Sequence, residues 1–204
     1  MKVIGIPKEI MKGENRVAAV PETVEKFTNM GFWVMVEKNA GQGIFRDDPE
    51  YKKAGATVVE DAESLYGNAD IILKVKQPLY NEDRRKHEIG MMKKMSFLIT
   101  FLHPAAPSNH GLLKMLTARR ITSFTMDGIP RISRAQSMDA LTSMSTVTGY
   151  KSVLIAAGHL PKMVPMLATS TGTLKPAHFL VIGIGVVGLQ ALATAKRLGG
   201  VLTA

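Results

Sequence analysis

Short apolar runs alternate with longer amphipathic ones over the first two thirds of the chain. The apolar runs, rich in Ile, Val and Leu, predict strands covered on both faces at Lys2–Ile6, Phe32–Glu37, Thr57–Val59, Asp70–Val75, Ser96–Phe101 and Ile121–Phe124. The segments between them predict helices at Pro21–Met30, Pro49–Ala54, Ala62–Tyr66, Asn81–Met92 and Asn109–Ala118. Because strands and helices alternate regularly, we expect an α/β domain with a parallel sheet over residues 1–136.

The pattern changes after Phe124. Residues 137–160 predict one connecting helix of uncertain length, and residues 161–176 form a linker rich in Pro, Gly and Thr. We place the domain boundary in this linker and expect a second domain to begin at residue 177. The buried side of the helix is expected to hold Met138, Leu141, Met144, Tyr150, Val153, Leu154 and Ala157.

A glycine pattern follows the next apolar strand. His178–Ile182 runs into Gly183, Gly185 and Gly188, and a helix of small residues comes after them. In this context the first glycine allows a tight turn, the second lets the backbone approach a pyrophosphate, and the third lets helix and strand pack closely. The sequence therefore predicts a Rossmann-like parallel-sheet domain followed by the start of a Rossmann NAD-binding domain at 177–204.

In such a unit, a second strand ends in an Asp or Glu that holds the adenosine ribose, about 20 residues past the glycines. Val201–Ala204 begins that strand, and no acidic residue follows the glycines. We therefore expect an incomplete nucleotide site and little activity from this chain alone. A non-catalytic interaction module is one interpretation of this feature.

Composition narrows the class of protein. With 204 residues, 46% hydrophobic and 21% charged, the chain is globular rather than disordered or fibrous, and we expect a cytosolic protein without a membrane span. The lack of cysteine excludes disulfides and thiolate chemistry, and the five scattered histidines predict no metal site. The net charge of +9 is spread along the sequence, which favours a hydrated surface over a nucleic-acid site.

The segment PRISRAQSMDALTSMS, from Pro130 to Ser145, is unusually polar for the opening of a half-buried helix. Ser137 is predicted to cap the helix, with Asp139 in its first turn and Thr142 one turn further. Together with Arg131 and Gln136, these groups suit a nicotinamide amide and its ribose hydroxyls. On periodicity alone, a capped helix with a hydrated polar face is the favoured explanation.

The residue order decides between these interpretations. This segment resembles the NAD(H)-binding component of proton-translocating nicotinamide nucleotide transhydrogenases, in the alanine dehydrogenase/transhydrogenase family. The likeness extends to GIPKE, NRVAAVPE, ILKVKQP, GYKSVLIAA and GIGVVGLQALATAKRLG. It implies direct hydride transfer between NAD(H) and NADP(H), with Arg131, Gln136 and Asp139 positioning the nicotinamide. Thr142 stands where that family has a serine, and it keeps the hydroxyl.

The same resemblance implies partners. An NADP(H)-binding component would supply the second nucleotide, and a membrane subunit would form the proton channel. This chain would lie in the cytoplasm at the inner membrane, held there by the partner subunits, and would form a homodimer.

Alanine dehydrogenases are similar in the same N-terminal domain and provide the competing hypothesis. There, residues matching Arg16, Lys76 and His103 bind the substrate carboxylate and perform acid/base steps in the NAD-dependent reductive amination of pyruvate. A guanidinium, an amine and an imidazole suit that chemistry. We rank this activity second because the alanine dehydrogenase pattern lacks the PRISRAQSMD loop.

Overall fold

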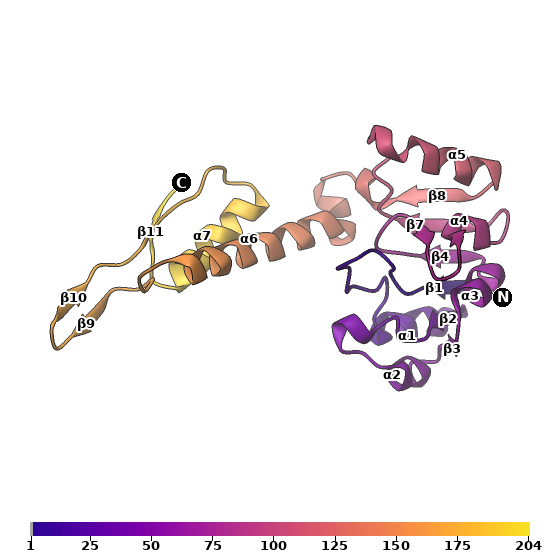
Figure 1. The fold of residues 1–204 in the computed structure, drawn as a ribbon, viewed down its shortest axis with the longest axis horizontal. Coiled ribbons are helices and arrows are strands. Elements are labelled where there is room, and N and C mark those ends of the chain that lie inside the picture. The colour runs from indigo at the N-terminus through magenta and orange to yellow at the C-terminus, as the bar shows by residue number, and fades with distance from the viewer. Residues whose placement is uncertain (1) are drawn as a thin grey trace. The chain divides into compact units, whose positions relative to one another are not determined.

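Six parallel strands form the centre of the first unit, Met1–Ile129, in a computed structural model that describes residues 2–204 (Figure 1). The sheet order is β3 (Thr57–Val59), β2 (Trp33–Glu37), β1 (Val3–Ile6), β4 (Ile71–Leu73), β7 (Phe97–Thr100) and β8 (Thr122–Thr125). The chain runs outward from β1 on one side and then returns to β4 on the other. This order confirms the predicted Rossmann-like sheet and places a topological switch between β1 and β4.

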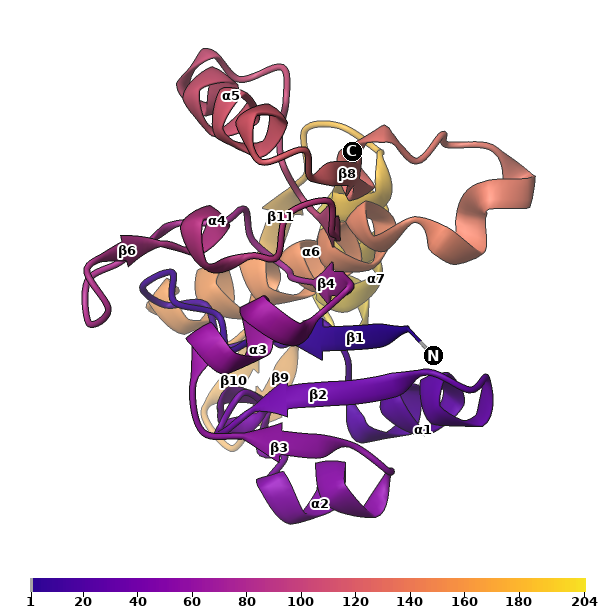
Figure 2. The same cartoon turned by 90° about the vertical axis from the view of Figure 1, so that its right-hand side faces the viewer.

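Two apolar clusters hold helices against the sheet, and the alternation of side chains along β1 assigns them to opposite faces. Ile4 and Ile6 belong to the cluster that includes α1 (Pro21–Asn29) and α2 (Asp48–Lys53), which lie beside β2 and β3 in Figure 2. Gly5 faces the other cluster, where a Cβ would lie 2.7 Å from the Ala69 Cβ. That cluster contains α3 (Ala62–Asn68), α4 (Glu88–Met91) and α5 (His110–Ala118).

Residues 81–92 do not form the predicted helix. Instead, β5 (Tyr80–Asn81) and β6 (Lys86–His87) make an antiparallel hairpin, and only α4 is helical. The Asn81 side chain accepts a hydrogen bond from the Arg84 N–H, and Arg85 has a left-handed backbone with φ of 48°. An asparagine side chain that bonds to a nearby backbone N–H competes with helix formation. The helix is therefore confined to α4 and does not reach back to Asn81.

The second unit, Pro130–Ala204, is built on the long helix α6 (Ala140–His159) and on α7 (Val186–Arg197). β11 (His178–Leu180) precedes α7 in the sequence and β12 (Val201–Thr203) follows it, and the two strands pair in parallel. This arrangement confirms the expected start of a Rossmann unit. β11 ends two residues before the predicted Ile182. The segment expected to be only a linker contains an antiparallel hairpin, β9 (Leu167–Thr169) and β10 (Gly172–Leu174), which projects from the end of α6 in Figure 1.

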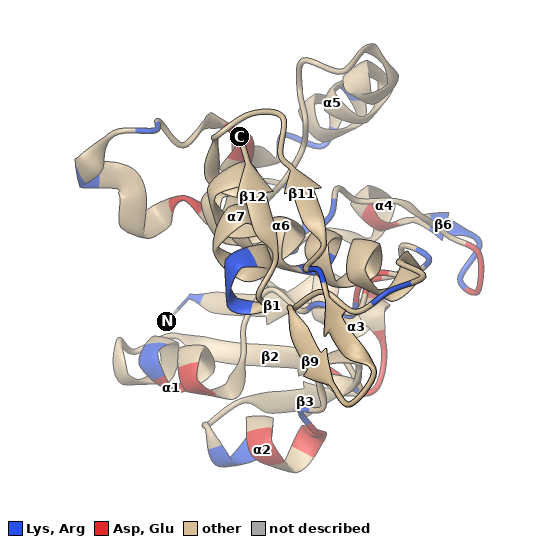
Figure 3. Cartoon of the chain, turned by 90° about the vertical axis from the view of Figure 1, so that its left-hand side faces the viewer, with Lys and Arg blue, Asp and Glu red and all other residues tan. Residues whose placement is uncertain are grey.

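Four short 3₁₀ helices complete the secondary structure described for residues 2–204, at Gln42–Ile44, Pro107–Asn109, Met126–Gly128 and Ser133–Met138. No helix within the same range is both long enough and apolar enough to cross a bilayer. Charge is uneven along the chain, since Asp139 is the only acidic residue after Pro130 while lysines and arginines continue to occur there (Figure 3). The second unit is therefore basic.

A glycine sets the distance between α6 and α7. Gly149 is buried, and a Cβ added there would lie 2.3 Å from the Val187 carbonyl oxygen and 3.1 Å from the Ala191 N. Both are backbone atoms, which cannot rotate away as a side chain can. One turn after Gly149, Val153 packs with Ala191 and Ala195 in the apolar core of the second unit.

The buried side of α6 is narrower than its sequence predicts. Val153 is buried as expected, whereas Met138 and Tyr150 are exposed. Met138 lies before the first turn of α6, in the 3₁₀ helix, so the helical spacing used to place it does not apply.

We expect Gly149→Ala to lower the free energy of unfolding of the second unit by about 2 kcal/mol or more, because the added methyl group must push α7 away from α6. The matched control is Gly158→Ala in the same helix, where nothing lies within 4 Å of the added Cβ. That change is expected to stabilise the helix by up to about 1 kcal/mol. Urea unfolding monitored by circular dichroism measures both, and equal stability of the two variants would contradict the packing argument.

Candidate functional site

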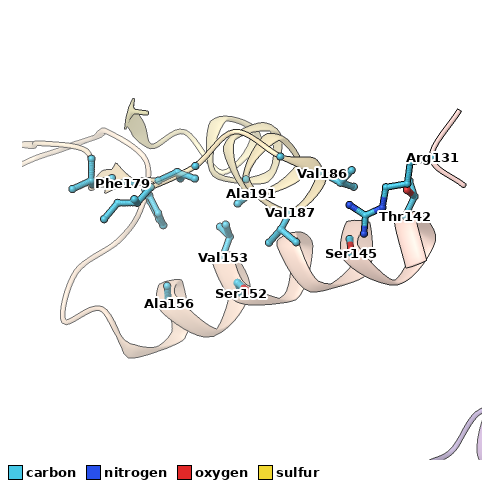
Figure 4. A pocket seen from close by; sticks show the side chains of 16 residues that line it. Arg131, Thr142, Ser145, Ser152, Val153, Ala156, Phe179, Val186, Val187 and Ala191 are labelled. Carbon is cyan, nitrogen blue, oxygen red and sulfur yellow. The ribbon is translucent and has the colours of Figure 1, made fainter. Parts of the chain in front are cut away.

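A cavity of about 640 Å³ lies between α6, α7 and the loop that follows β11 (Figure 4). It lies wholly within the second unit. The predicted residues that line it are Arg131, Thr142, Gly183, Gly185 and Gly188. The structure therefore brings the glycine loop and part of the polar segment to one concave surface, which is the usual form of a small-molecule site.

The three glycines of the loop have different geometries. Gly183 has a left-handed φ of 97°, which allows the turn out of β11. A Cβ at Gly188 would lie 1.9 Å from the Gly183 carbonyl oxygen, so only glycine lets α7 begin this close to the turn. A Cβ at Gly185 would meet nothing within 4 Å, and its space opens toward the cavity. These geometries fit the three roles expected of a phosphate-binding loop.

The amino terminus of α7 lies directly after this loop and borders the cavity. The helix begins at Val186, directly after Gly185, and Gly185 provides no side-chain cap for its first N–H groups. Unpaired N–H groups and the positive end of the helix dipole favour a bound phosphate. Val186 and Val187 line the cavity at this point. This part of the cavity thus fits a ligand whose phosphate lies at the helix terminus and whose apolar groups contact the two valines.

Asp139 caps α6. Its carboxylate accepts hydrogen bonds from the Thr142 N–H at 3.0 Å and from the Thr142 hydroxyl at 2.6 Å. These bonds lower the pKa of Asp139. The prediction that Ser137 would be the cap is wrong: Ser137 lies in the 3₁₀ helix Ser133–Met138, and α6 begins at Ala140. Asp139 suits the position because its two carboxylate oxygens satisfy two donors at once.

Arg131, Thr142 and Ser145 lie together at one end of the cavity in Figure 4. Asp139 adjoins this end through its bonds to Thr142, and the charge of Arg131 contributes to its lowered pKa. Gln136 is exposed in the 3₁₀ helix and is not among the lining residues. The polar end of the cavity therefore carries a cation, a carboxylate and hydroxyl groups.

The other end of the cavity is largely apolar and was not predicted from the sequence. Phe179 and Ala156 lie there in Figure 4, with Val153 and Ala191 between the two ends. A helical period would have indicated the α6 contribution, since one stripe of the helix runs through residues 142, 145, 149, 152, 153 and 156. The apolar residues of this stripe and its hydroxyl-bearing residues therefore line the same cavity.

The competing set of residues lies in the first unit, after the carboxyl ends of its strands. Arg16 donates from Nε and Nη2 to the two carboxylate oxygens of Glu14, at 2.7 and 2.6 Å. This pairing lowers the pKa of Glu14. The Lys76 Nζ lies 4.0 Å from the same carboxylate, so Arg16 and Lys76 share one anionic neighbour. A smaller cavity of about 260 Å³ is lined by Arg16 and Glu14, together with Glu9 and Asn15.

A buried cluster of charged side chains lies next to the backbone of Lys76. Lys74 is almost fully buried and pairs with Glu88 at 3.0 Å and with Glu9 at 3.3 Å. Glu9 also accepts the Val75 N–H at 2.6 Å and the Lys76 N–H at 3.4 Å. This cluster joins the segment after β1 to the end of β4 at the topological switch. The sequence interpretation missed it, although a lysine inside the strand run ILKVK was a visible signal.

His103 lies three residues after the end of β7 and pairs with Asp127, whose carboxylate is 2.7 Å from the His103 Nδ1. Burial tends to raise the pKa of Asp127, but hydrogen bonds from Thr125 and from the His103 backbone lower it overall. The His103 backbone is left-handed, with φ of 46°. His103 and Lys76 are not among the residues that line the smaller cavity, so the structure groups Arg16 with Lys76 through Glu14 and leaves His103 with Asp127.

Comparison with known families covers nearly the whole chain. The model of the alanine dehydrogenase/PNT N-terminal domain matches residues 5–148. The model of the alanine dehydrogenase/PNT C-terminal domain matches residues 152–204.

Similar individual proteins come from both branches. The chain is 44% identical to an NAD(P) transhydrogenase subunit alpha protein of Rhodospirillum rubrum, over 98% of this chain and 52% of that protein. It is 35% identical to alanine dehydrogenase of Methanococcus maripaludis, over 98% of this chain and 52% of that protein. A crystal structure of transhydrogenase from Sinorhizobium meliloti matches with a TM-score of 0.90 and 39% identity, over 98% of this chain and 57% of that one. The chain spans about half the length of these two curated relatives.

The glycine loop offers a test of its packing geometry. We expect Gly188→Ala to destabilise the second unit by about 2 kcal/mol or more, because its Cβ would clash with the Gly183 backbone. Gly185→Ala is the matched change at an open position and is expected to leave the melting temperature within about 2 °C of the unchanged protein. Thermal unfolding followed by circular dichroism compares them. A Gly188→Ala variant as stable as Gly185→Ala would contradict this geometry.

Proposed function

This chain belongs to the alanine dehydrogenase/PNT family, and from that premise we propose that it is the NAD(H)-binding portion of a proton-translocating transhydrogenase. Its reaction would be direct hydride transfer between NAD(H) and NADP(H). The identity of 44% to a transhydrogenase subunit, against 35% to an alanine dehydrogenase, supports this choice. The observation that carries it is the cavity that combines the glycine loop with Arg131 and Thr142.

The residues of the cavity fit a dinucleotide. Gly185 leaves open space at the amino terminus of α7, where backbone N–H groups would hold a pyrophosphate. Arg131, Thr142 and Asp139 would hold the nicotinamide half at the polar end, and we assign Gln136 to the same half although its side chain is exposed. The carboxamide of a nicotinamide both donates and accepts hydrogen bonds, which a guanidinium and a carboxylate together can match.

The role of this chain would be orientation. A bound nicotinamide supplies the hydride chemistry, so the protein needs no nucleophile. Asp139 holds the first turn of α6 in place, and α6 in turn presents its polar stripe to the cavity. Holding two reactants in a productive geometry can contribute roughly 7 to 11 kcal/mol to lowering a barrier. The close packing of α6 against α7 at Gly149 would help to hold this stripe in place.

We also propose the partners that this activity requires. An NADP(H)-binding component would supply the second nucleotide, and a membrane subunit would carry the proton path. We propose that this chain would join the membrane complex through those subunits. We propose that it forms a homodimer there.

Alanine dehydrogenase is the second candidate, because Arg16 and Lys76 lie at one carboxylate in the first unit. Both cations are near the topological switch, where open α/β sheets bind ligands. However, the two donor groups of Arg16 that face Glu14 are already engaged by its carboxylate. An incoming 2-oxo acid would compete with Glu14 for these donors of Arg16. We therefore rank the reductive amination of pyruvate behind hydride transfer between nucleotides.

We expect the natural full-length protein to bind NADH, measured as enhanced nucleotide fluorescence on titration. In the same preparation, addition of pyruvate and ammonia should leave the NADH absorbance unchanged, whereas a thio-NADP or comparable NADP analogue should accept the hydride in the assembled complex. Binding without either activity would favour the interaction-module hypothesis. Robust formation of alanine would reject the transhydrogenase proposal.

Substitutions can separate a role of the polar end of the cavity in hydride transfer from the role of Asp139 as the cap of α6. Asp139→Asn keeps an acceptor for the Thr142 N–H but removes the charge, and Gln136→Ala removes an exposed side chain. We expect either change to slow hydride transfer by about tenfold to a hundredfold in the assembled complex while the melting temperature changes little.

Ser137→Ala is the control, since Ser137 is exposed in the same 3₁₀ helix and does not cap α6. Stopped-flow measurement of transfer to an NADP analogue gives the rates. If Asp139→Asn and Gln136→Ala match Ser137→Ala in rate, the polar end is only a capped helix.

A further inference from the structure

The side chain of His87 holds the start of α4 in the first unit. Its Nδ1 accepts a hydrogen bond from the Ile89 N–H at 3.2 Å and so caps the helix. An imidazole nitrogen can accept a hydrogen bond only while it carries no proton, so this cap requires neutral His87 with its proton on Nε2. The usual capping residues keep their acceptors between pH 5 and 8, whereas histidine changes charge in this range.

The helix that this cap holds carries a buried carboxylate. α4 has only four residues, directly after β6 (Figure 2), and Glu88 is the first of them. The Glu88 carboxylate is almost fully buried and accepts hydrogen bonds from the Tyr66 hydroxyl at 2.6 Å and from the Lys74 Nζ at 3.0 Å. It also accepts the Leu79 N–H at 2.8 Å. Because so short a helix does not form by itself in water, release of its first turn would move the carboxylate that compensates Lys74.

The surroundings of His87 leave it neutral at pH 7 and within reach of water. It is half-buried and lines a cavity of about 420 Å³ with Lys86 and Glu63, which pair with each other at 2.7 Å. Tyr80 lies opposite His87 in the β5–β6 hairpin and is exposed. Burial lowers the pKa of His87, and the charge of Glu88 opposes this effect. The hairpin turn adds two acidic and two basic side chains, all exposed: Glu82, Asp83, Arg84 and Arg85.

We propose that His87 is an acid-sensitive latch: its neutral imidazole holds the start of α4, and its protonation releases α4 together with the β5–β6 hairpin. An imidazolium carries an N–H on both ring nitrogens, so a donor would then face the Ile89 N–H. The latch belongs to the first unit and does not depend on the proposed function.

The direction of the pH dependence follows from linkage. Since the folded chain takes up the proton of His87 less readily than the unfolded chain, protons favour the open form. The stability from the latch is fully present above about pH 6.5, the ordinary pKa of histidine, and is lost as the pH falls through the lowered pKa.

The test is hydrogen–deuterium exchange of the natural full-length protein at pH 7.5 and pH 5.5, measured by mass spectrometry on peptides that cover residues 79–92. After correction for intrinsic exchange rates, we expect protection of this segment to fall by about threefold at pH 5.5, within the tenfold per pH unit that one proton allows. His87→Asn supplies a capping oxygen that does not titrate and should keep its protection within about 1.5-fold. His87→Ala has no side-chain acceptor and should be weakly protected at both pH values.

His110→Asn is the matched control, because His110 is an exposed histidine at the start of α5 in the same unit. It should lose protection of residues 79–92 at pH 5.5 as the unchanged protein does. If His87→Asn loses as much protection as His110→Asn, or if the unchanged protein keeps its protection at pH 5.5, the latch is rejected. Binding of NADH is measured separately, so loss of the proposed function would leave this inference standing.

Discussion

The close backbone contact between α6 and α7 is the constraint on which the candidate site depends. At Gly149 the two helices approach until a Cβ would lie 2.3 Å from the Val187 carbonyl oxygen. Val187 is in the first turn of α7, directly after the glycine loop, so this contact fixes the loop relative to the stripe of α6 that holds Thr142 and Ser145. Gly188 makes a second contact of the same kind with the Gly183 carbonyl oxygen. Two glycines thus allow α7 to pack closely against both α6 and the loop that follows β11.

Hydrogen bonding within α6 then determines which polar groups are available to a ligand. Three hydroxyls of the helix, those of Thr146, Thr148 and Ser152, donate to the carbonyl oxygen one turn earlier, and the Thr142 hydroxyl is held by Asp139. Because Asp139 is both the helix cap and the only acidic residue of the second unit, the same carboxylate stabilises the helix and sets the local charge. The remaining charge of this unit is positive, which suits a ligand with two phosphates.

The first unit carries a different kind of support. Lys74, Glu9 and Glu88 are buried together, and Tyr66 donates to Glu88 at 2.6 Å. Burial raises the pKa of Tyr66 well above its ordinary value, so its hydroxyl keeps its proton and remains a donor. A cluster of this kind is costly unless every charge has a partner, and removal of one member would leave a buried charge uncompensated. It holds the end of β4, and therefore Lys76, in a fixed position.

The sequence by itself determined the order of strands and helices, the parallel sheet and the glycine loop, because hydrophobic periodicity and glycine spacing are local properties. It also indicated Arg131, Asp139 and Thr142 through their order in one segment. It failed at 81–92, where the local bond of Asn81 opposed the helix, and at the cap of α6.

Only the tertiary structure decided which of these residues share a surface. It placed Arg131 and Thr142 with the glycines, left Gln136 exposed, and added Ser145 and Phe179 to the cavity. These pairings join residues that lie far apart in the sequence, and they depend on how closely α6 approaches α7. That distance is set by the missing side chain at Gly149, whose effect appears only when the two helices meet.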